Sequence, residues 1–195
     1  METSRNIFFR IGRLGLVLTA AALCFVTSTI QAAGTEMPPA PDFKQPDPAA
    51  WINSEPLTLA DLRGQVVLVY LWKIDSVNCA KSFPWLAEVE KKYGPKGLRL
   101  IGVHTPETDA EKERGVVNAR IQDLMLKDPV MLDNDMHYWN ALHNHYWPAF
   151  YLIDKDGRLR GSFIGETHEG DKQAAAIETL IATLLAEPAP PAERH

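Results

Sequence analysis

Cys79 is the residue of this chain best placed for nucleophilic or redox chemistry. Of the two cysteines it is the one that lies outside the apolar N-terminal run, and Ser76 stands three positions before it. Both follow a short apolar stretch, residues 66–71, and precede apolar residues at helical spacing. A thiol in the first turn of a helix lies among unpaired backbone amides, which favour the thiolate. The pattern predicts a reactive thiol or, equally, a small buried hydrophobe.

Charged neighbours act on this thiol in opposite directions. Lys73 and Lys81 would lower the pKa of Cys79, whereas Asp75 would raise it. Ser76 is predicted to cap the helix, because serine accepts hydrogen bonds from first-turn amides. Its hydroxyl does not replace a thiolate at neutral pH, since no base is adjacent in the sequence.

The elements that hold this turn follow from apolar periodicity. Residues 66–71 are predicted to form a strand buried on both faces, and the helix after Ser76 should stop at Gly94 and Pro95. A helix from 109 to about 126 should turn Val116, Val117, Ile121, Leu124 and Met125 inward, and Val77 should face inward on the first helix. Further strands are predicted at 98–103, 129–133 and 158–164, and further helices at 135 to about 145, with Trp139 and Leu142 inward, and at 172–186.

Residues 72–79 resemble the active-site turn of the thioredoxin-like redoxins, in particular the TlpA type and the periplasmic thioredoxin-like domain of DipZ. In those proteins a tryptophan and a short spacer precede Cys-x-x-Cys. Trp72 and Cys79 match this pattern, while Ser76 stands in place of the first, attacking cysteine. The resemblance covers roughly residues 51–186. It implies an α/β thioredoxin fold, a central mixed sheet flanked by helices, with a redoxin-type N-terminal extension and an insertion before the cis-proline strand.

The resemblance also implies roles for single residues. Pro148 matches the cis-proline that faces the active-site turn, and Trp72, Trp147 and Pro148 are the predicted substrate-binding residues. Cys79 inherits the position of the resolving cysteine, so Cys79 and Ser76 are the predicted catalytic pair. Tyr70 stands where the family commonly has a buried acid that exchanges protons with the resolving cysteine. Both the thiol and the proton chemistry of the family are therefore altered.

Other chemistries fit the residues less well. Ser76 and Cys79 match the second half of the peroxiredoxin motif Pro-x-x-x-Thr/Ser-x-x-Cys, but a tryptophan stands where that motif has its proline. His143 and His145 are two positions apart at a helix end, where side chains diverge, and no second cysteine or carboxylate cluster completes a metal site. The sequence predicts neither a metal nor a cofactor.

Residues 1–33 are predicted to be a secretory signal peptide. Arginines precede an apolar run, residues 14–26, that is shorter than the ~20 apolar residues of a membrane span. Small residues follow, and cleavage is expected after Ala32 or Ala33, with retention as an anchor as the alternative. The mature protein should be periplasmic. Within it we expect a Pro-rich leader at 34–50, a thioredoxin-like domain at 51–187 and a flexible tail at 188–195.

Composition bounds the function. A hydrophobic fraction of 46% suits one folded domain, and the net charge of -5 is scattered without a basic stripe, which argues against nucleic acid as a partner. Two hypotheses remain. In the first, this exported redoxin acts enzymatically through Cys79, which is oxidised by peroxide or joins a mixed disulfide and is restored by an outside thiol. In the second, it is a degenerate redoxin whose cleft binds a peptide or protein of the cell envelope. The expected partners are protein thiols or disulfides, or an unknown envelope protein, with no stable membrane span after signal cleavage.

Overall fold

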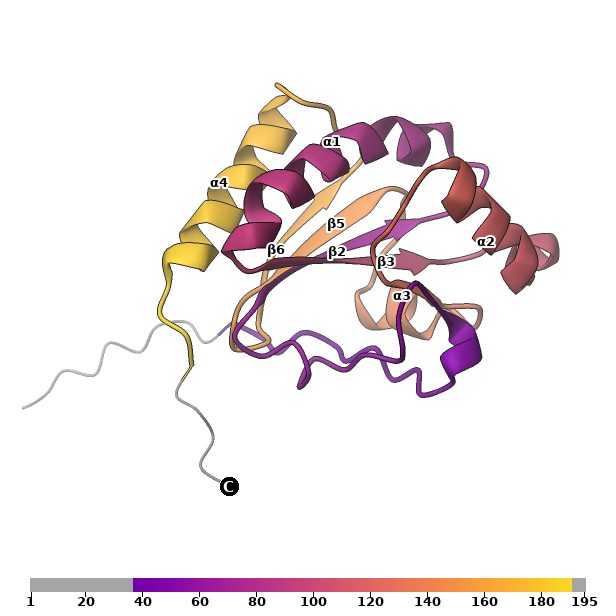
Figure 1. Cartoon of the computed structure of the whole chain (residues 1–195), viewed down its shortest axis with the longest axis horizontal. Helices are drawn as coiled ribbons and strands as arrows, with labels where there is room; N and C mark the ends of the chain where they lie inside the picture. Colours follow the sequence, from indigo (N-terminus) through magenta and orange to yellow (C-terminus); the bar gives the residue numbers. More distant parts are fainter. Residues whose placement is uncertain (1–36, 191–195) are drawn as a thin grey trace, which may run out of the picture. The chain divides into compact units, whose positions relative to one another are not determined.

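The computed structural model describes residues 37–190, so the predicted signal peptide lies outside the described part, as does most of the predicted tail. Six strands form one mixed sheet in the order β1-β4-β3-β2-β5-β6 (Figure 1). β2 and β3 run parallel, as do β3 and β4, while β5 and β6 are antiparallel to their neighbours. The strands are β1(Trp51–Ile52), β2(Val66–Trp72), β3(Leu98–His104), β4(Val130–Leu132), β5(Ala149–Ile153) and β6(Leu159–Ile164). The helices are α1(Val77–Tyr93), α2(Arg114–Asp123), α3(His137–Ala141) and α4(Lys172–Ala186), with 3-10 turns at Pro48–Ala50, Gly94–Lys96 and Asp109–Lys112.

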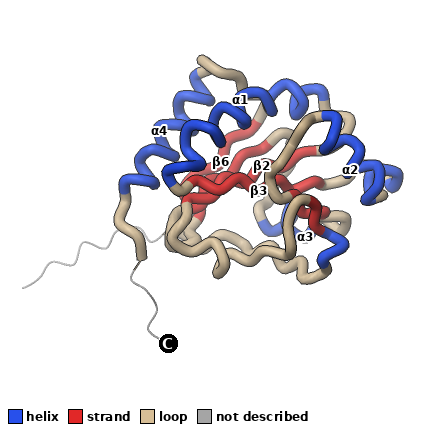
Figure 2. Tube along the Cα trace, in the orientation of Figure 1, coloured by secondary structure: helices blue, strands red, loops and turns tan. Residues whose placement is uncertain are grey.

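The central strand β2 divides the core into two layers. Every residue of β2 is buried, which explains its unbroken apolar sequence. Alternate residues face opposite sides of a strand, so Leu68 and Tyr70 join one core cluster and Val67 and Val69 join the other. Helices cover both sides of the sheet, as Figure 2 shows in blue against the red strands. This two-sided cover confirms the predicted thioredoxin fold, with a central mixed sheet flanked by helices.

One face of the sheet carries α1, α2 and α4. Their apolar side chains join the core cluster that contains Leu68 and Tyr70 of β2. These side chains are Leu86 and Val89 of α1, Ile121 of α2, and Ile177 and Ile181 of α4. α1 and α4 lie side by side in Figures 1 and 2. The insertion predicted between the second strand and the cis-proline strand consists of the Asp109–Lys112 turn, α2, β4 and α3.

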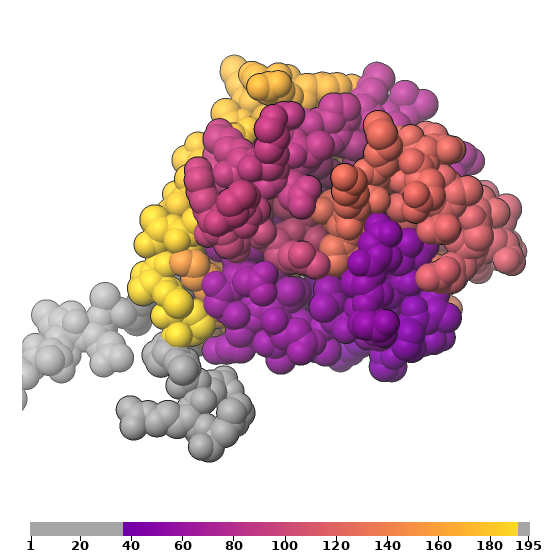
Figure 3. All heavy atoms as spheres, in the orientation of Figure 1, coloured from indigo at the N-terminus to yellow at the C-terminus, as the bar shows by residue number. Residues whose placement is uncertain are grey.

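The Pro-rich segment covers part of the other face of the sheet. Ala40 and Phe43 are buried, and the Phe43 ring packs against Trp51 and Tyr138 at centroid distances of 5.7 and 5.1 Å. The backbone N–H of Ala40 donates a hydrogen bond to the carbonyl of Gly157 in the β5–β6 turn. Figure 3 shows this indigo segment packed against the body of the domain. Ala40 and Phe43 thus belong to the core, although they lie in the segment predicted to be a Pro-rich leader.

Two predicted helices are shorter than expected. The 109–126 helix is a 3-10 turn followed by α2, and Val116 and Met125 are exposed rather than inward. Val77 is also exposed, at the first position of α1. α3 covers five residues because Met136, with φ of 58°, and His143, with φ of 50°, leave the helical region on either side.

The remaining predictions on these elements hold. The Trp147–Pro148 peptide is cis, as the resemblance implied. Gly157 has φ of 78° in the β5–β6 turn, a conformation that glycine adopts without a steric penalty. α4 spans the predicted residues 172–186, and Trp139 is buried in the second core layer.

Candidate functional site

The candidate site begins where β2 ends and α1 starts. Ser76 is the N-cap of α1, and its Oγ accepts a hydrogen bond from the backbone N–H of Cys79 at 3.2 Å, which confirms the predicted cap. Cys79 is a free cysteine with 1% of its surface exposed. The thiol therefore lies beneath the first turn of α1 and does not present itself to solvent.

Burial outweighs the groups that favour a thiolate. The pKa of Cys79 is raised above its ordinary value chiefly because burial disfavours the charged form. Hydrogen bonds from the Ser76 hydroxyl and the Lys73 backbone, together with the Lys73 charge, oppose this shift without reversing it. Burial therefore outweighs the groups near Cys79 that favour the thiolate, and the net direction of the pKa shift is upward. At neutral pH Cys79 is a thiol rather than a thiolate.

Two ion pairs engage the lysines beside the turn. Lys73 pairs with Glu107, and its ammonium lies 5.2 Å from the centre of the Trp147 ring. Lys81 lies 3.4 Å from Glu166. Glu107 follows β3 and Glu166 follows β6, so two loops distant in sequence meet the two ends of this turn. The cation over Trp147 also fixes that ring beside the end of β2.

The predicted substrate-binding residues divide into buried and accessible ones. Trp72 has no exposed surface and Pro148 is buried, so Trp72 supports the turn from below instead of meeting a substrate as predicted. Trp147 is half-buried and packs against Trp139 at 4.3 Å. Pro148 is joined to the end of β6, because its carbonyl accepts a hydrogen bond from Gly165.

Accessible apolar side chains surround these residues. Tyr146 is 66% exposed and precedes Trp147, Val77 is 64% exposed and follows Ser76, and Ile164 is 43% exposed. Strand register places Ile164 level with Ala149 and Leu71, so it lies at the same end of the sheet as the Ser76 turn and the Trp147–Pro148 peptide. The sequence alone did not predict that Tyr146, Val77 and Ile164 lie at the surface, because apolar side chains at these positions fit a core equally well.

Polar atoms without partners lie under the turn. His104, paired with Trp72 in the β2–β3 register, has no exposed surface, and its ring centre lies 5.1 Å from that of Trp72. Within residues 37–190, neither ring nitrogen of His104 has a hydrogen-bond partner, nor do Trp72 Nε1 and Thr105 Oγ1. Burial lowers the pKa of His104 to about 4, so the imidazole is neutral at physiological pH. It brings no positive charge to the thiol.

An acid that the sequence did not reveal lies beside Tyr70, on the α1 side of the sheet. Tyr70, at the position of the family's buried acid, directs its hydroxyl to Asp128 Oδ2 at 3.3 Å. The Tyr70 ring crosses Gly102, where a Cβ would approach the hydroxyl to 2.8 Å, so only glycine leaves room for it. Burial, followed by the charge of Glu90, raises the pKa of Asp128 to about 6. A carboxyl group is thus present in this region, carried by the residue two positions before β4 instead of by β2 itself.

The described residues contain neither a cluster of metal-binding side chains nor a helix that could span a membrane. Between residues 37 and 190, no three His, Cys, Asp or Glu side chains are grouped as a metal site would need. None of the helices in this part of the chain is long and apolar enough to cross a membrane.

Comparisons with known proteins agree with this geometry. The family model described as AhpC/TSA family matches residues 38–162. The chain is 38% identical over 154 residues to Protein DipZ of Mycobacterium tuberculosis, covering 77% of this chain and 21% of that protein. It is 30% identical over 139 residues to the thiol-disulfide oxidoreductase YkuV of Bacillus subtilis, covering 71% of this chain and 89% of YkuV. The crystal structure of the thioredoxin-like superfamily protein SPOA0173 superposes with a TM-score of 0.68 at 28% identity, covering 80% of this chain and all of that one.

A thioredoxin fold with a strand–turn–helix site opposite a cis-proline defines a thioredoxin-like redoxin. The chain belongs to the AhpC/TSA redoxin family, with thiol-disulfide oxidoreductases among its homologues. It spans about a fifth of the length of the DipZ proteins that it matches.

Proposed function

We propose that this protein is an exported redoxin that has kept the substrate-facing surface of a thiol-disulfide oxidoreductase but lacks its dithiol chemistry, and that it binds extended segments of other envelope proteins. The observation that carries the proposal is the contrast between Cys79, which is 1% exposed, and the apolar side chains around it, which are accessible. Binding needs the second feature, whereas thiol exchange needs an accessible thiolate.

The thiol chemistry fails at two points. A dithiol cycle requires an attacking thiolate and a second thiol that resolves the mixed disulfide. Ser76 occupies the attacking position, and its hydroxyl points to the backbone N–H of Cys79 as a cap. Cys79 is buried, with a raised pKa, so it is a weak nucleophile at neutral pH.

The binding surface has the composition of a recognition site. Tyr146, Val77 and Ile164 expose apolar surface around the half-buried Trp147, and aromatic rings of this kind bind with little loss of conformational entropy. The lysines on its two sides are paired with Glu107 and Glu166. An uncharged, extended segment fits this surface better than a strongly charged one.

A cysteine-blocked unfolded protein tests binding separately from thiol chemistry. We expect reduced, carboxymethylated α-lactalbumin to bind the purified protein, and Tyr146→Ser to weaken this binding at least about fivefold, as for an aromatic interface residue. Val116→Ser, which removes an exposed apolar side chain from α2, serves as the matched control and should have no effect. Equal binding by Tyr146→Ser and the unaltered protein would contradict the proposal.

Restoring the missing thiol tests the assignment of Ser76. The unaltered protein should not reduce insulin, whereas Ser76→Cys should gain activity because the helix start would then carry Cys-x-x-Cys. The rate of alkylation of Cys79 against pH completes the test. A midpoint well below ~8.5 would favour the single-cysteine enzyme, in which peroxide oxidises the thiolate and an outside thiol reduces it.

Export is part of the proposal. The predicted cleavage after Ala32 or Ala33 would place the domain in the periplasm, and peptide mass spectrometry of the cell-envelope fraction tests it. An intact N-terminus from Met1 in the mature protein would refute cleavage.

A further inference from the structure

A groove lies along the side of α1 that faces away from α4. It is a pocket of about 590 Å³ between α1 and the segment that leads from α2 into β4. The α1 wall is formed by Ala80, Phe83, Pro84 and Ala87, which share one helix face at i, i+3, i+4 and i+7 spacing. The opposite wall is formed by residues 123–128. A space of this size accommodates several side chains of another molecule.

The second wall is held in place by backbone contacts. Asn53 Nδ2 donates to the carbonyls of Leu126 and Asp128 at 3.1 and 3.0 Å. The backbone N–H of Leu126 donates a hydrogen bond to the carbonyl of Ile121, near the end of α2. Met125 adopts φ of 54° between these anchors, and its side chain is 80% exposed on the rim. A methionine held outward in this way offers an adaptable apolar contact.

The groove is largely apolar, and the neighbouring carboxylates of Glu90 and Asp128 form its acidic end. Phe83, Leu124 and Leu126 supply apolar surface, while Glu90, Asp123 and Asp128 bring three carboxylates against Lys127 alone among the lining residues. Pro84 has no N–H to donate to the carbonyl of Ala80, so this acceptor lacks its helical partner.

We propose that this groove docks a segment of a partner protein that presents apolar side chains next to a lysine or arginine. The apolar side chains would pack between α1 and Met125, and the cation would lie at Glu90 and Asp128. Charge complementarity selects this occupant, because the acidic end would repel a segment that carries carboxylates. The proposal concerns a different surface from the one around Ser76 and does not depend on it.

The surroundings of Asp128 support a cationic occupant. Its carboxyl group is half-buried next to Glu90, and the Tyr70 hydroxyl and the charge of Arg99 oppose the resulting rise in its pKa without reversing it. Bringing a cation to this carboxylate would offset the cost of keeping it ionised. Binding should therefore weaken as pH falls through about 6, where Asp128 becomes protonated.

Three amidated peptides of leucine combined with lysine, glutamine or glutamate test the proposal by titration calorimetry on the purified protein. We expect the lysine peptide to bind, the glutamine peptide to bind about tenfold more weakly, and the glutamate peptide not to bind, as for loss of a charge-assisted contact. Glu90→Gln combined with Asp128→Asn should remove the preference for lysine. Glu88→Gln, on the other side of α1, is the matched control and should retain it.

A steric variant tests the position of the docked segment. Ala87→Trp fills the groove from an exposed helix position and should abolish binding of the lysine peptide, whereas Glu88→Trp should leave it intact. Tyr146→Ser should also leave it intact, so failure here is distinguishable from failure of the proposed function. Equal binding of the glutamate peptide, insensitivity to Ala87→Trp, or self-association that Ala87→Trp abolishes would each overturn the proposal.

Discussion

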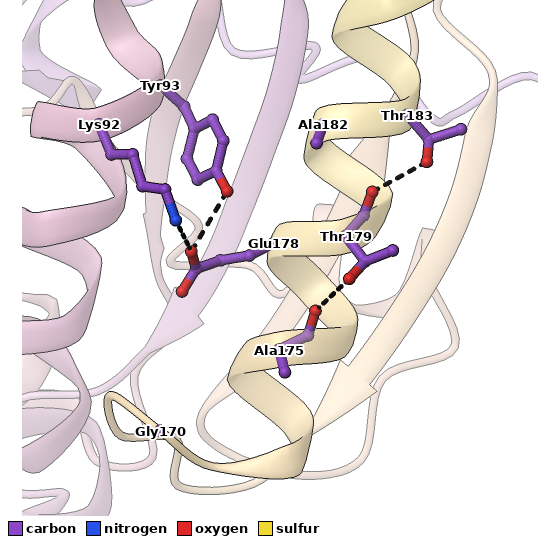
Figure 4. Close-up of a pocket in the computed structure, with 8 residues that line it drawn as sticks. All are labelled: Lys92, Tyr93, Gly170, Ala175, Glu178, Thr179, Ala182 and Thr183. Carbon is purple, nitrogen blue, oxygen red and sulfur yellow. Dashed lines mark hydrogen bonds and ion pairs between the residues drawn. The ribbon is translucent and has the colours of Figure 1, made fainter.

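On each side of α1 a partly buried carboxylate lies against the helix, and the two carboxylates have different partners. On the side toward α4, Glu178 accepts hydrogen bonds from Trp85 Nε1 at 3.4 Å, Lys92 Nζ at 2.6 Å and the Tyr93 hydroxyl at 3.2 Å, two of which Figure 4 shows. On the other side, Asp128 has the Tyr70 hydroxyl at 3.3 Å and a second carboxylate, Glu90, nearby. On the first side the carboxylate links α4 to α1. On the second side two carboxylates lie close together, and a bound cation would stabilise them.

The pKa values of the two acids record this difference. Burial raises the pKa of Glu178, but hydrogen bonds from Lys92 and Trp85 outweigh it and leave the pKa below its ordinary value. For Asp128, burial and the charge of Glu90 prevail and raise the pKa to about 6. Burial raises the pKa of both acids. The net direction of each pKa shift therefore depends on the hydrogen bonds and charges that each acid meets beside α1.

The largest expected effect is an opposite response of the two sides to pH. Because folding raises the pKa of Asp128 from 3.8 to about 6, the folded state binds the proton more tightly. Its contribution to stability is therefore full below pH 3.8 and is lost as pH rises through 6, by up to about 3 kcal/mol. Urea unfolding of the unaltered protein and of Asp128→Asn measures this from pH 4 to 8. The free energy of unfolding of the unaltered protein, relative to that of Asp128→Asn, should fall as pH rises.

Glu178 provides the contrasting curve for the same experiment. Its pKa is lowered on folding, so its contribution is present above the ordinary glutamate pKa and is lost as pH falls below it. The free energy of unfolding of the unaltered protein, relative to that of Glu178→Gln, should therefore increase as pH rises. Curves of the same sign for the two acids would refute the distinction between the two sides.

A smaller effect is expected from removing a carboxylate on each side at neutral pH. Glu178→Ala leaves Trp85 Nε1 and the Tyr93 hydroxyl without their acceptor at a partly buried joint, which should cost about 1–3 kcal/mol. Glu90→Ala on the groove side should change stability by no more than about 0.5 kcal/mol, because its residue is exposed. Chemical denaturation at pH 7 measures both, and a larger loss for Glu90→Ala would reverse the comparison.

Sequence reasoning predicted the features that depend on local pattern. The apolar run of β2, the cap at Ser76 and the periodicity of α4 each reflect short-range rules, and the structure shows them where they were expected. The cis peptide before Pro148 came from the family resemblance. These elements surround the turn at Ser76 and hold it in position.

The features that the sequence did not reveal depend on contacts between distant segments. The burial of Phe43 requires Tyr138, which lies far along the chain, so the Pro-rich composition alone indicated a leader. The pKa of Cys79 depends on how deeply α1 packs, which no sequence pattern measures. The Tyr70 hydroxyl reaches Asp128 only because Gly102 has no Cβ, which leaves space for the Tyr70 ring.

The smallest expected effect isolates the hydroxyl at the base of the groove side. Tyr70→Phe removes the donor that stabilises the Asp128 carboxylate, so the pKa of Asp128 should rise further above 6, and stability at pH 7 should fall by about 1 kcal/mol. Tyr151→Phe is the matched control, since its buried hydroxyl donates to the uncharged Asn144 Oδ1 at 2.9 Å. Its cost should be similar but independent of pH between 5 and 7, whereas the cost of Tyr70→Phe should diminish as Asp128 is protonated. Carboxyl NMR titration together with unfolding at the two pH values decides the matter, and an unchanged Asp128 titration in Tyr70→Phe would show that the phenol does not act on the carboxylate.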